Sequence, residues 1–134
     1  MIRVEGLTKD FGPRRAIDGL TFGAEKGEIL GFLGPNGAGK TTTMRILCGF
    51  MPPTSGKAEI VGFDVIEDSL EVRRRVGYMP ETVPLYSDMT VFDYLKFMAD
   101  LRRLPEAEER VEEVLELVGM EERAEGYIKN LSKG

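Results

Sequence analysis

The chain has 134 residues, of which 42% are hydrophobic and 31% charged, and its net charge is −5. This length suits one domain with a modest core, and the acidic balance disfavours nucleic acid as a general partner. One cysteine and no histidine exclude an intrachain disulfide, a cysteine-rich zinc site and histidine-based catalysis within these residues.

The first 27 residues are predicted to form antiparallel strands. Residues 2–5 alternate between apolar and charged side chains, as a half-exposed strand does. Phe-Gly-Pro at 11–13 predicts a turn, and strand character resumes over residues 16–24. Residues 28–33 then form a nearly continuous apolar run, which is typical of a strand buried on both faces of a parallel sheet.

Residues 34–42, Gly-Pro-Asn-Gly-Ala-Gly-Lys-Thr-Thr, fit the phosphate-binding pattern G-x-x-x-x-G-K-[ST]. The pattern needs a strand before it, expected at 28–33, and a helix after it. An apolar stripe indicates that helix: Met44, Leu47, Cys48 and Met51. We expect the helix to end at Gly49, before two prolines.

Each residue type in this loop has a chemical reason. The three glycines let backbone N–H groups approach an anion closely, and the helix N-terminus adds unpaired N–H donors. Lys40 supplies a point charge for the outer phosphates, and Thr41 offers a hydroxyl ligand for Mg²⁺. A plain glycine-rich turn is the alternative, which the predicted strand and helix disfavour.

The next part of the chain continues as mixed structure. A strand is predicted over 57–62, with an extension over 63–65 after a kink, and a short strand over 76–79. A short helix is expected over 69–75, with Asp68 as its N-cap.

From about residue 88 the pattern is helical. Thr-Val-Phe-Asp at 90–93 is a capping-box pattern, and Pro105 fits the first turn of a further helix that ends before Gly119. The apolar face of this second helix comprises Val111, Val114, Leu115 and Val118. Its glutamates are expected to face solvent rather than to bind a metal: Glu108, Glu109, Glu112, Glu113 and Glu116.

Taken in order, these motifs resemble those of the ATP-binding subunits of ABC transporters, and the resemblance covers the whole chain. Residues 34–42 resemble the Walker A loop of that family. Phe11 takes the place of the aromatic residue that stacks on adenine, although a turn aromatic can also pack on the core. Residues 78–81 take the place of the Q-loop, and residues 131–134, Leu-Ser-Lys-Gly, are similar to the start of the signature motif.

The resemblance implies an α/β fold of the P-loop NTPase class. It comprises a RecA-like core with an antiparallel β subdomain, plus an α-helical subdomain, and it is truncated before the Walker B strand. Residues 1–86 would form the antiparallel β and phosphate-loop part, and residues 87–134 the helical subdomain up to the start of the signature motif.

ATP and Mg²⁺ are the ligands that the resemblance implies. Lys40 would neutralise phosphate charge, Thr41 and Glu81 would contact the metal, and Thr42 would bind the α-phosphate. The implied nucleotide-binding set is Phe11, Gly34, Pro35, Asn36, Gly37, Ala38, Gly39, Lys40, Thr41 and Thr42. The ATP of a partner subunit would be contacted by Ser132, Lys133 and Gly134.

The sequence departs from the family pattern in three ways. Glu81 replaces the usual glutamine of the Q-loop, and Lys133 replaces a glycine of the signature. Both changes are similar to members that serve two-component (ABC-2-like) exporters of drugs, antibiotics or polysaccharides. The chain also stops inside the signature, so we expect an N-terminal fragment of a longer ATPase, with no catalytic residue, weak nucleotide binding and no steady hydrolysis by itself.

The function expected of the full-length protein is ATP hydrolysis coupled to transport by a partner membrane permease, in a homodimer or heterodimer of ATPase subunits. No apolar run approaches the length of a membrane span and no signal peptide opens the chain, so we expect a peripheral protein at the cytoplasmic face of the membrane, soluble when isolated. The alternatives are a P-loop metabolite kinase, a non-transport ABC-type ATPase and a non-hydrolysing nucleotide-binding module.

Overall fold

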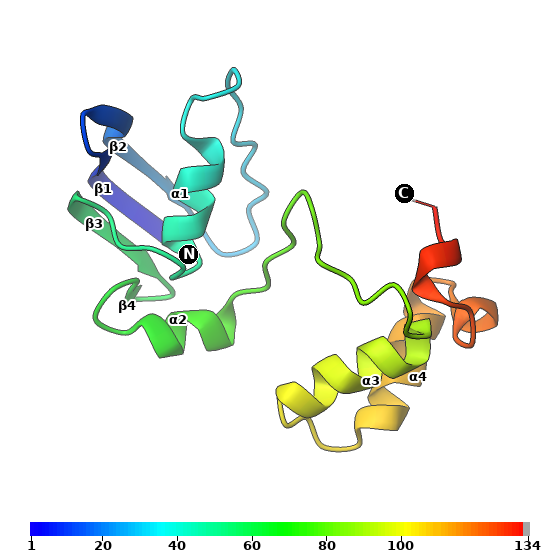
Figure 1. Ribbon diagram of the computed structural model, residues 1–134. Helices are drawn as coiled ribbons and strands as arrows, with labels where there is room; N and C mark the ends of the chain where they lie inside the picture. Colours follow the sequence, from blue (N-terminus) through cyan, green and yellow to red (C-terminus); the bar gives the residue numbers. More distant parts are fainter. Residues whose placement is uncertain (133–134) are drawn as a thin grey trace. The chain divides into compact units, whose positions relative to one another are not determined.

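The computed structural model describes residues 1–132, which fall into two compact units: residues 1–79 and the residues from Pro80 onward. Figure 1 shows the helices and strands of both units. Each unit has its own hydrophobic core. The division into domains at residues 86 and 87 stays a prediction.

The first unit is built on a four-stranded antiparallel sheet with the order β2-β1-β3-β4. Its strands are β1 (Ile2–Phe11), β2 (Arg14–Ala24), β3 (Ser55–Ile60) and β4 (Phe63–Asp64). The central strand β1 pairs Val4 with Phe22 of β2 on one side and with Ala58 of β3 on the other. The antiparallel strands expected before residue 25 are therefore confirmed.

Two helices in this unit contribute side chains to the same core as the sheet. Helix α1 (Lys40–Leu47) contributes Ile46, which is fully buried, and helix α2 (Ser69–Arg75) contributes Val72. Both helices were predicted from the sequence, and α2 has the predicted bounds. The Asp68 side chain does not cap α2, because its Oδ2 accepts a hydrogen bond from the Asp64 N–H instead, at 3.2 Å.

Local signals end α1 where the sequence predicted. Gly49 has φ of +70°, a left-handed conformation that suits glycine, and the Phe50 N–H donates back to the Arg45 carbonyl at 2.9 Å. Cys48 is buried next to this turn, and burial raises the pKa of its thiol. This agrees with a core role for the cysteine rather than a reactive one.

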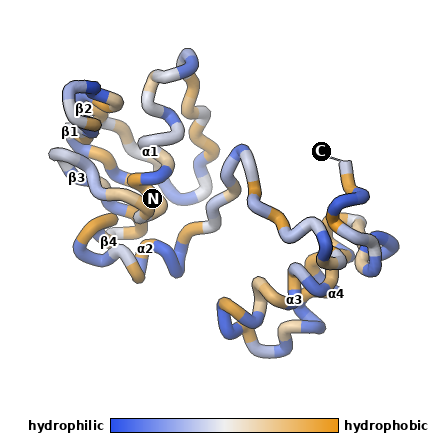
Figure 2. The backbone as a smooth tube through the Cα atoms, viewed as in Figure 1, coloured by the Kyte–Doolittle hydropathy of each residue, from blue (hydrophilic) through white to orange (hydrophobic). Residues whose placement is uncertain are grey.

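Three strand predictions in this unit were wrong. Residues 28–33 form no strand, and Ile29 and Leu33 are almost completely exposed, although Figure 2 shows the apolar colour of this stretch. Residues 76–79 form no strand either. An extended segment needs a neighbouring strand for its backbone N–H and C=O groups, and within residues 1–132 no strand pairs with either stretch.

The third wrong prediction concerns residues 63–65, which were expected to extend the strand before them. Instead β4 folds back antiparallel to β3, pairing Phe63 with Ile60. Val61 and Gly62 have φ of +52° and +81°, and two successive positive φ values make the tight turn of a β-hairpin.

The second unit is helical, as predicted. It contains α3 (Val91–Leu101), α4 (Ala107–Leu117), η1 (Glu121–Arg123) and η2 (Ile128–Asn130). The predicted cap of α3 is formed, since Thr90 Oγ1 accepts from the Asp93 N–H at 3.1 Å. The core comprises Val91, Val111, Leu115 and Ile128.

For α4, the predicted start differs from the observed one, whereas the predicted end agrees with it. Pro105 lies before the helix rather than in its first turn, because Glu106, with φ of +52°, is the N-cap. Gly119 follows the helix with φ of +66°, as predicted. Among the described residues, no helix combines the length and the apolar character needed to span a membrane.

Candidate nucleotide-binding site

The phosphate-loop residues curl tightly into the start of α1. Gly37 and Gly39 both have φ of +85°, and Gly39 is the left-handed N-cap of the helix. The Ala38 N–H donates to the Pro35 carbonyl at 3.2 Å, which closes the turn. Only glycine takes such a conformation without strain, so the glycines of the sequence pattern have a structural cause here.

The loop packs against strand β2 at Gly39. A Cβ atom on Gly39 would lie 2.3 Å from the Ala16 carbonyl oxygen and 3.1 Å from Ile17 Cγ1. The backbone of the loop is therefore seated directly on β2. Sequence reasoning missed Ala16 and Ile17, because they lie 23 and 22 positions before Gly39 and a contact at that separation leaves no local signal.

The side chain of Lys40 folds back over the loop. Its Nζ donates to the carbonyls of Gly34 at 2.6 Å and Pro35 at 2.7 Å. An ammonium group has three donors, so one remains for an anion. The positive charge is thus held above the turned backbone.

The first-turn amides of α1 complete the donor set. Within residues 1–132, the N–H groups of Lys40, Thr41 and Thr42 donate to no backbone carbonyl. Thr43 is buried, and its Oγ1 bonds to the Gly39 carbonyl at 3.0 Å, which fixes the helix start. Free amides, the positive end of the helix dipole and one ammonium suit the phosphates of a nucleotide.

A magnesium ion also fits the donors present. Thr41 is exposed beside the loop, and its hydroxyl is available as an oxygen ligand. The described residues contain no cluster of three or more acidic, cysteine or histidine side chains that can hold a metal. Mg²⁺ usually keeps several waters and binds through few protein ligands together with the phosphates of a substrate, so the one hydroxyl of Thr41 suits an ion that binds with a nucleotide.

A cavity of about 330 Å³ lies between β2 and the loop. Its lining residues are Arg15, Ala16, Ile17, Asp18, Leu20, Phe32, Gly37, Ala38 and Thr43. Arg15 is held by two carboxylates: its Nε lies 2.9 Å from Asp10 Oδ1, and its Nη1 lies 2.9 Å from Asp18 Oδ1. These bonds, that to Asp10 above all, raise the pKa of Arg15.

Phe11 lies at the end of β1, opposite Arg14 across the hairpin. Its side chain is 47% exposed, so it does not pack in the core. Lys9 Nζ lies 5.3 Å from the ring centroid and donates to the Pro52 carbonyl at 2.7 Å. An open aromatic face at this position can stack on a planar base.

The remaining predicted site residues belong to the second unit. Glu81 and Ser132 are exposed. Lys133 and Gly134 lie outside the described residues. A shared metal site of Glu81 and Thr41 stays a prediction from the sequence.

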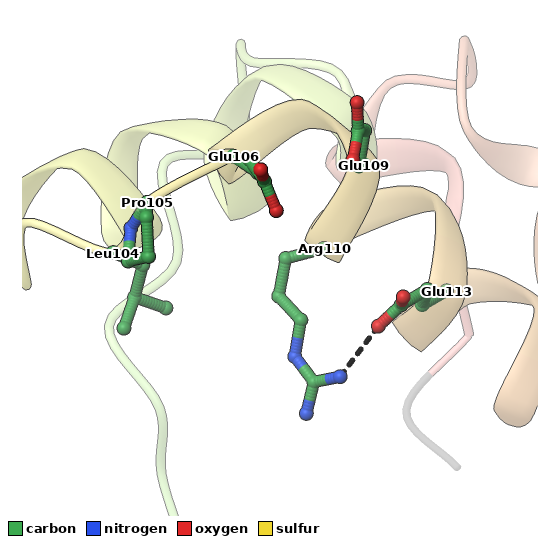
Figure 3. A pocket seen from close by; sticks show the side chains of 6 residues that line it. All are labelled: Leu104, Pro105, Glu106, Glu109, Arg110 and Glu113. Atoms are coloured by element: carbon green, nitrogen blue, oxygen red, sulfur yellow. Dashed lines mark hydrogen bonds and ion pairs between the residues drawn. The ribbon is translucent and has the colours of Figure 1, made fainter.

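Another hollow, of about 340 Å³, lies at the start of α4 (Figure 3). Its lining combines Leu104 and Pro105 with three glutamates and Arg110, whose Nη1 donates to Glu113 Oε2 at 2.5 Å. The glutamates of α4 that were expected to face solvent are all exposed, which confirms that expectation.

The loop, its glycines and its lysine define a nucleotide-binding protein of the P-loop class. A family model described as "ABC transporter" matches residues 17–134. A solved structure titled "Structure of ATP binding subunit of ABC transporter" has a TM-score of 0.82 and 30% identity, and it covers 98% of this chain and 56% of that chain. The chain belongs to the ABC transporter family, and the predicted α/β P-loop fold is confirmed.

Two curated relatives match over all of this chain. The linearmycin resistance ATP-binding protein LnrL of Bacillus subtilis is 35% identical, with 44% of its length covered. The bacitracin transport ATP-binding protein BcrA of Bacillus licheniformis is 36% identical, again with 44% covered. The chain thus spans less than half the length of these relatives.

Proposed function

We propose that the protein is the subunit of a membrane transporter that binds Mg-ATP and hydrolyses it. The observation that carries this proposal is the loop geometry: left-handed Gly37 and Gly39, free amides at the start of α1, and the Lys40 ammonium above the turn. Free amides occur at every helix start, but their combination here with a glycine loop and an ammonium group suits a polyphosphate. Membership in the ABC transporter family supports the same role.

Each residue of the loop has a defined task in this proposal. The Lys40 ammonium draws the outer phosphates towards the loop, and the amides of Thr41 and Thr42 bond to phosphate oxygens. Phe11 stacks on the adenine ring. Mg²⁺, when bound, neutralises charge on the phosphates, with Thr41 as its ligand on this chain.

Roles outside the first unit are proposed from the sequence. Glu81 is proposed to contact the metal and to link it to the helical unit. Ser132, Lys133 and Gly134 are proposed to contact ATP on a second ATPase subunit. The helical unit is proposed to dock on a membrane permease, which would hold the protein at the cytoplasmic face of the membrane.

The names of the relatives support export of a drug-like or antibiotic molecule. One is named for linearmycin resistance and the other for bacitracin transport. We therefore expect that deleting the gene lowers the inhibitory concentration of at least one antibiotic in a panel of cell-envelope agents. Unchanged susceptibility across such a panel would argue against an export function.

Calorimetry with Mg-ATP on the intact protein tests nucleotide binding. Replacing Lys40 with alanine should weaken binding by about ten-fold or more, since a hydrogen bond to a charged group contributes roughly 1.5–3 kcal/mol. Lys26→Ala, which removes an exposed lysine from the turn after β2, is the matched control and should bind normally.

Two results would contradict the proposal. One is the absence of Mg-ATP binding by the intact wild-type protein. The other is equal binding by the wild type and the Lys40→Ala variant, because the loop ammonium would then have no part in holding phosphate.

A further inference from the structure

A bulge in β2 lies beside the contact between that strand and the phosphate loop. The pairing of β1 with β2 shifts register here, so that Thr8 of β1 lies opposite two residues of β2, Asp18 and Gly19. Gly19 has φ of +58°, the left-handed conformation that glycine takes in one common type of bulge. A bulge bends its strand and increases the local twist, so it decides how the neighbouring residues of that strand are presented.

The side chain of Thr8 closes this bulge. It is buried, and its Oγ1 accepts a hydrogen bond from the Gly19 N–H at 3.0 Å and donates to the Gly6 carbonyl at 3.4 Å. The extra residue of a bulge lacks its usual backbone partner on the neighbouring strand, and the hydroxyl supplies one. Without the hydroxyl, a part-buried N–H would have no partner, which costs more than a typical hydrogen bond contributes.

The phosphate loop packs on the part of β2 that directly precedes this bulge. Ile17 is buried in the core, and a Cβ atom on Gly39 would lie 2.3 Å from the Ala16 carbonyl oxygen. Ala16 lies at a further register shift and has no paired residue on β1. Its carbonyl is therefore placed by the course of β2 itself, which the bulge bends. Because Gly39 directly precedes Lys40, a shift of this part of β2 would move the phosphate donors of the loop.

A second bulge in the same hairpin provides a comparison. Here Glu5 and Gly6 of β1 lie opposite Thr21 of β2. Gly6 has φ of +56°, and its N–H donates to Thr21 Oγ1 at 2.9 Å. Each bulge thus combines a left-handed glycine with a threonine hydroxyl that accepts from it. The second bulge, however, packs on β3, where a Cβ atom on Gly56 would lie 2.3 Å from the Gly6 carbonyl oxygen.

We propose, on the basis of the proposed function, that Thr8 is a positioning residue for nucleotide binding, which acts through the bulge of β2 beside the phosphate loop. In this role Thr8 does not touch the nucleotide. Its hydroxyl holds Gly19, the bulge places the carbonyl of Ala16, and that carbonyl packs against Gly39 at the start of α1. The hydroxyl of Thr8 therefore affects the affinity for phosphates, whereas the hydroxyl of Thr21 affects stability alone.

The test measures binding of Mg-ATP and of inorganic tripolyphosphate to the intact protein by calorimetry, together with the urea midpoint of each variant. Thr8→Val keeps the shape of the side chain and removes the hydroxyl. It should weaken binding of both ligands by about three- to ten-fold, because the unpaired N–H of Gly19 disturbs the bulge. Thr8→Ser keeps the hydroxyl and should restore binding. Thr21→Val is the matched control, which should lower the urea midpoint to a similar extent and leave both affinities unchanged.

A second pair of variants disturbs the two bulges through the backbone. Gly19→Ala and Gly6→Ala each place a side chain at a similar positive φ, and no atom lies within 4 Å of the added Cβ at either position. The backbone strain is therefore alike in the two variants, and only Gly19→Ala should weaken binding of Mg-ATP and tripolyphosphate.

The inference is overturned if Thr8→Val binds Mg-ATP as tightly as the wild type, if Thr8→Ser binds as weakly as Thr8→Val, or if Thr21→Val weakens binding as much as Thr8→Val does. If Thr8→Val does not fold, the glycine pair decides, and equal affinities of Gly19→Ala and Gly6→Ala overturn the inference. Absence of Mg-ATP binding by the wild type would instead contradict the proposed function itself.

Discussion

Apolar residues lie on both sides of the phosphate loop, but only those after the loop form a regular element and enter the core. The downstream flank forms α1 and buries Ile46 and Leu47 in the core. The upstream flank, residues 28–33, has no regular structure and leaves Ile29 and Leu33 in contact with solvent.

The difference shows what each kind of element needs. A helix bonds its own backbone groups within the segment, so α1 forms once one face can pack on the sheet. A strand bonds to another strand, and hydrophobicity does not replace that partner. The same apolar content therefore predicts structure well on one side of the loop and poorly on the other.

The sharpest test of this comparison pairs one substitution from each flank in the chain of residues 1–134. Ile46→Ala should lower the free energy of unfolding by about 2–5 kcal/mol, because it removes fully buried methyl groups. Leu33→Ala should change it by no more than about 0.5 kcal/mol, since the side chain is 93% exposed. Urea unfolding followed by circular dichroism measures both.

If Leu33→Ala lowers the free energy of unfolding nearly as much as Ile46→Ala does, the contrast between the two flanks is wrong, because Leu33 would then be buried in solution.

The next largest effect on stability is expected at the contact between the loop and β2, where Gly39 packs on Ala16. Gly39→Ala adds a Cβ atom 2.3 Å from the Ala16 carbonyl at a left-handed backbone position, and strain of this kind costs about 1–3 kcal/mol. Gly37→Ala is the control, with the same φ of +85° but no atom within 4 Å of the added Cβ. We expect a lower urea midpoint for Gly39→Ala than for Gly37→Ala, and equal midpoints would show that the β2 contact does not constrain the loop.

Local helix signals can be tested in the second unit. Thr90→Ala removes the side-chain oxygen that caps α3 and should destabilise that unit by about 0.5–2 kcal/mol. Asp68→Ala precedes α2 but makes no cap bond to that helix, so it should have the smaller effect. Thermal unfolding of the two variants compares them, and a larger loss for Asp68→Ala would contradict the assignment of caps.

The smallest effect concerns pH and the ion pairs that Glu71, in the first turn of α2, makes with Arg74 and Arg75. The pKa of Glu71 is lowered, first by the hydrogen bond from Arg75, so the folded protein binds this proton more weakly than the unfolded chain. The stabilisation is therefore present above the ordinary value of about 4.3 and is lost as pH falls through the lowered pKa. Urea midpoints of the wild type and Glu71→Gln should differ slightly at pH 7, and the difference should shrink as the pH falls below the ordinary pKa of a glutamate. A difference that does not change with pH would refute this.

Several parts of the molecule followed from the sequence. Residues 69–75 are a helix with the predicted bounds, Thr90 caps α3, and Gly49 and Gly119 follow helix ends with positive φ. Each of these depends on residues within one or two turns of each other. The prediction for 63–65 failed where two positive φ values, one at Val61, reversed the chain into a hairpin that a valine does not signal.

The sequence by itself determined that residues 34–42 form a glycine-rich loop leading into a helix, because glycine conformations and a helix N-terminus are properties of one short segment. Only the tertiary structure decided that this loop packs on Ala16, that Arg15 bonds to both Asp10 and Asp18, and that residues 28–33 pair with no described strand. These features join residues distant along the chain, and such contacts depend on how strands and helices pack rather than on any local pattern.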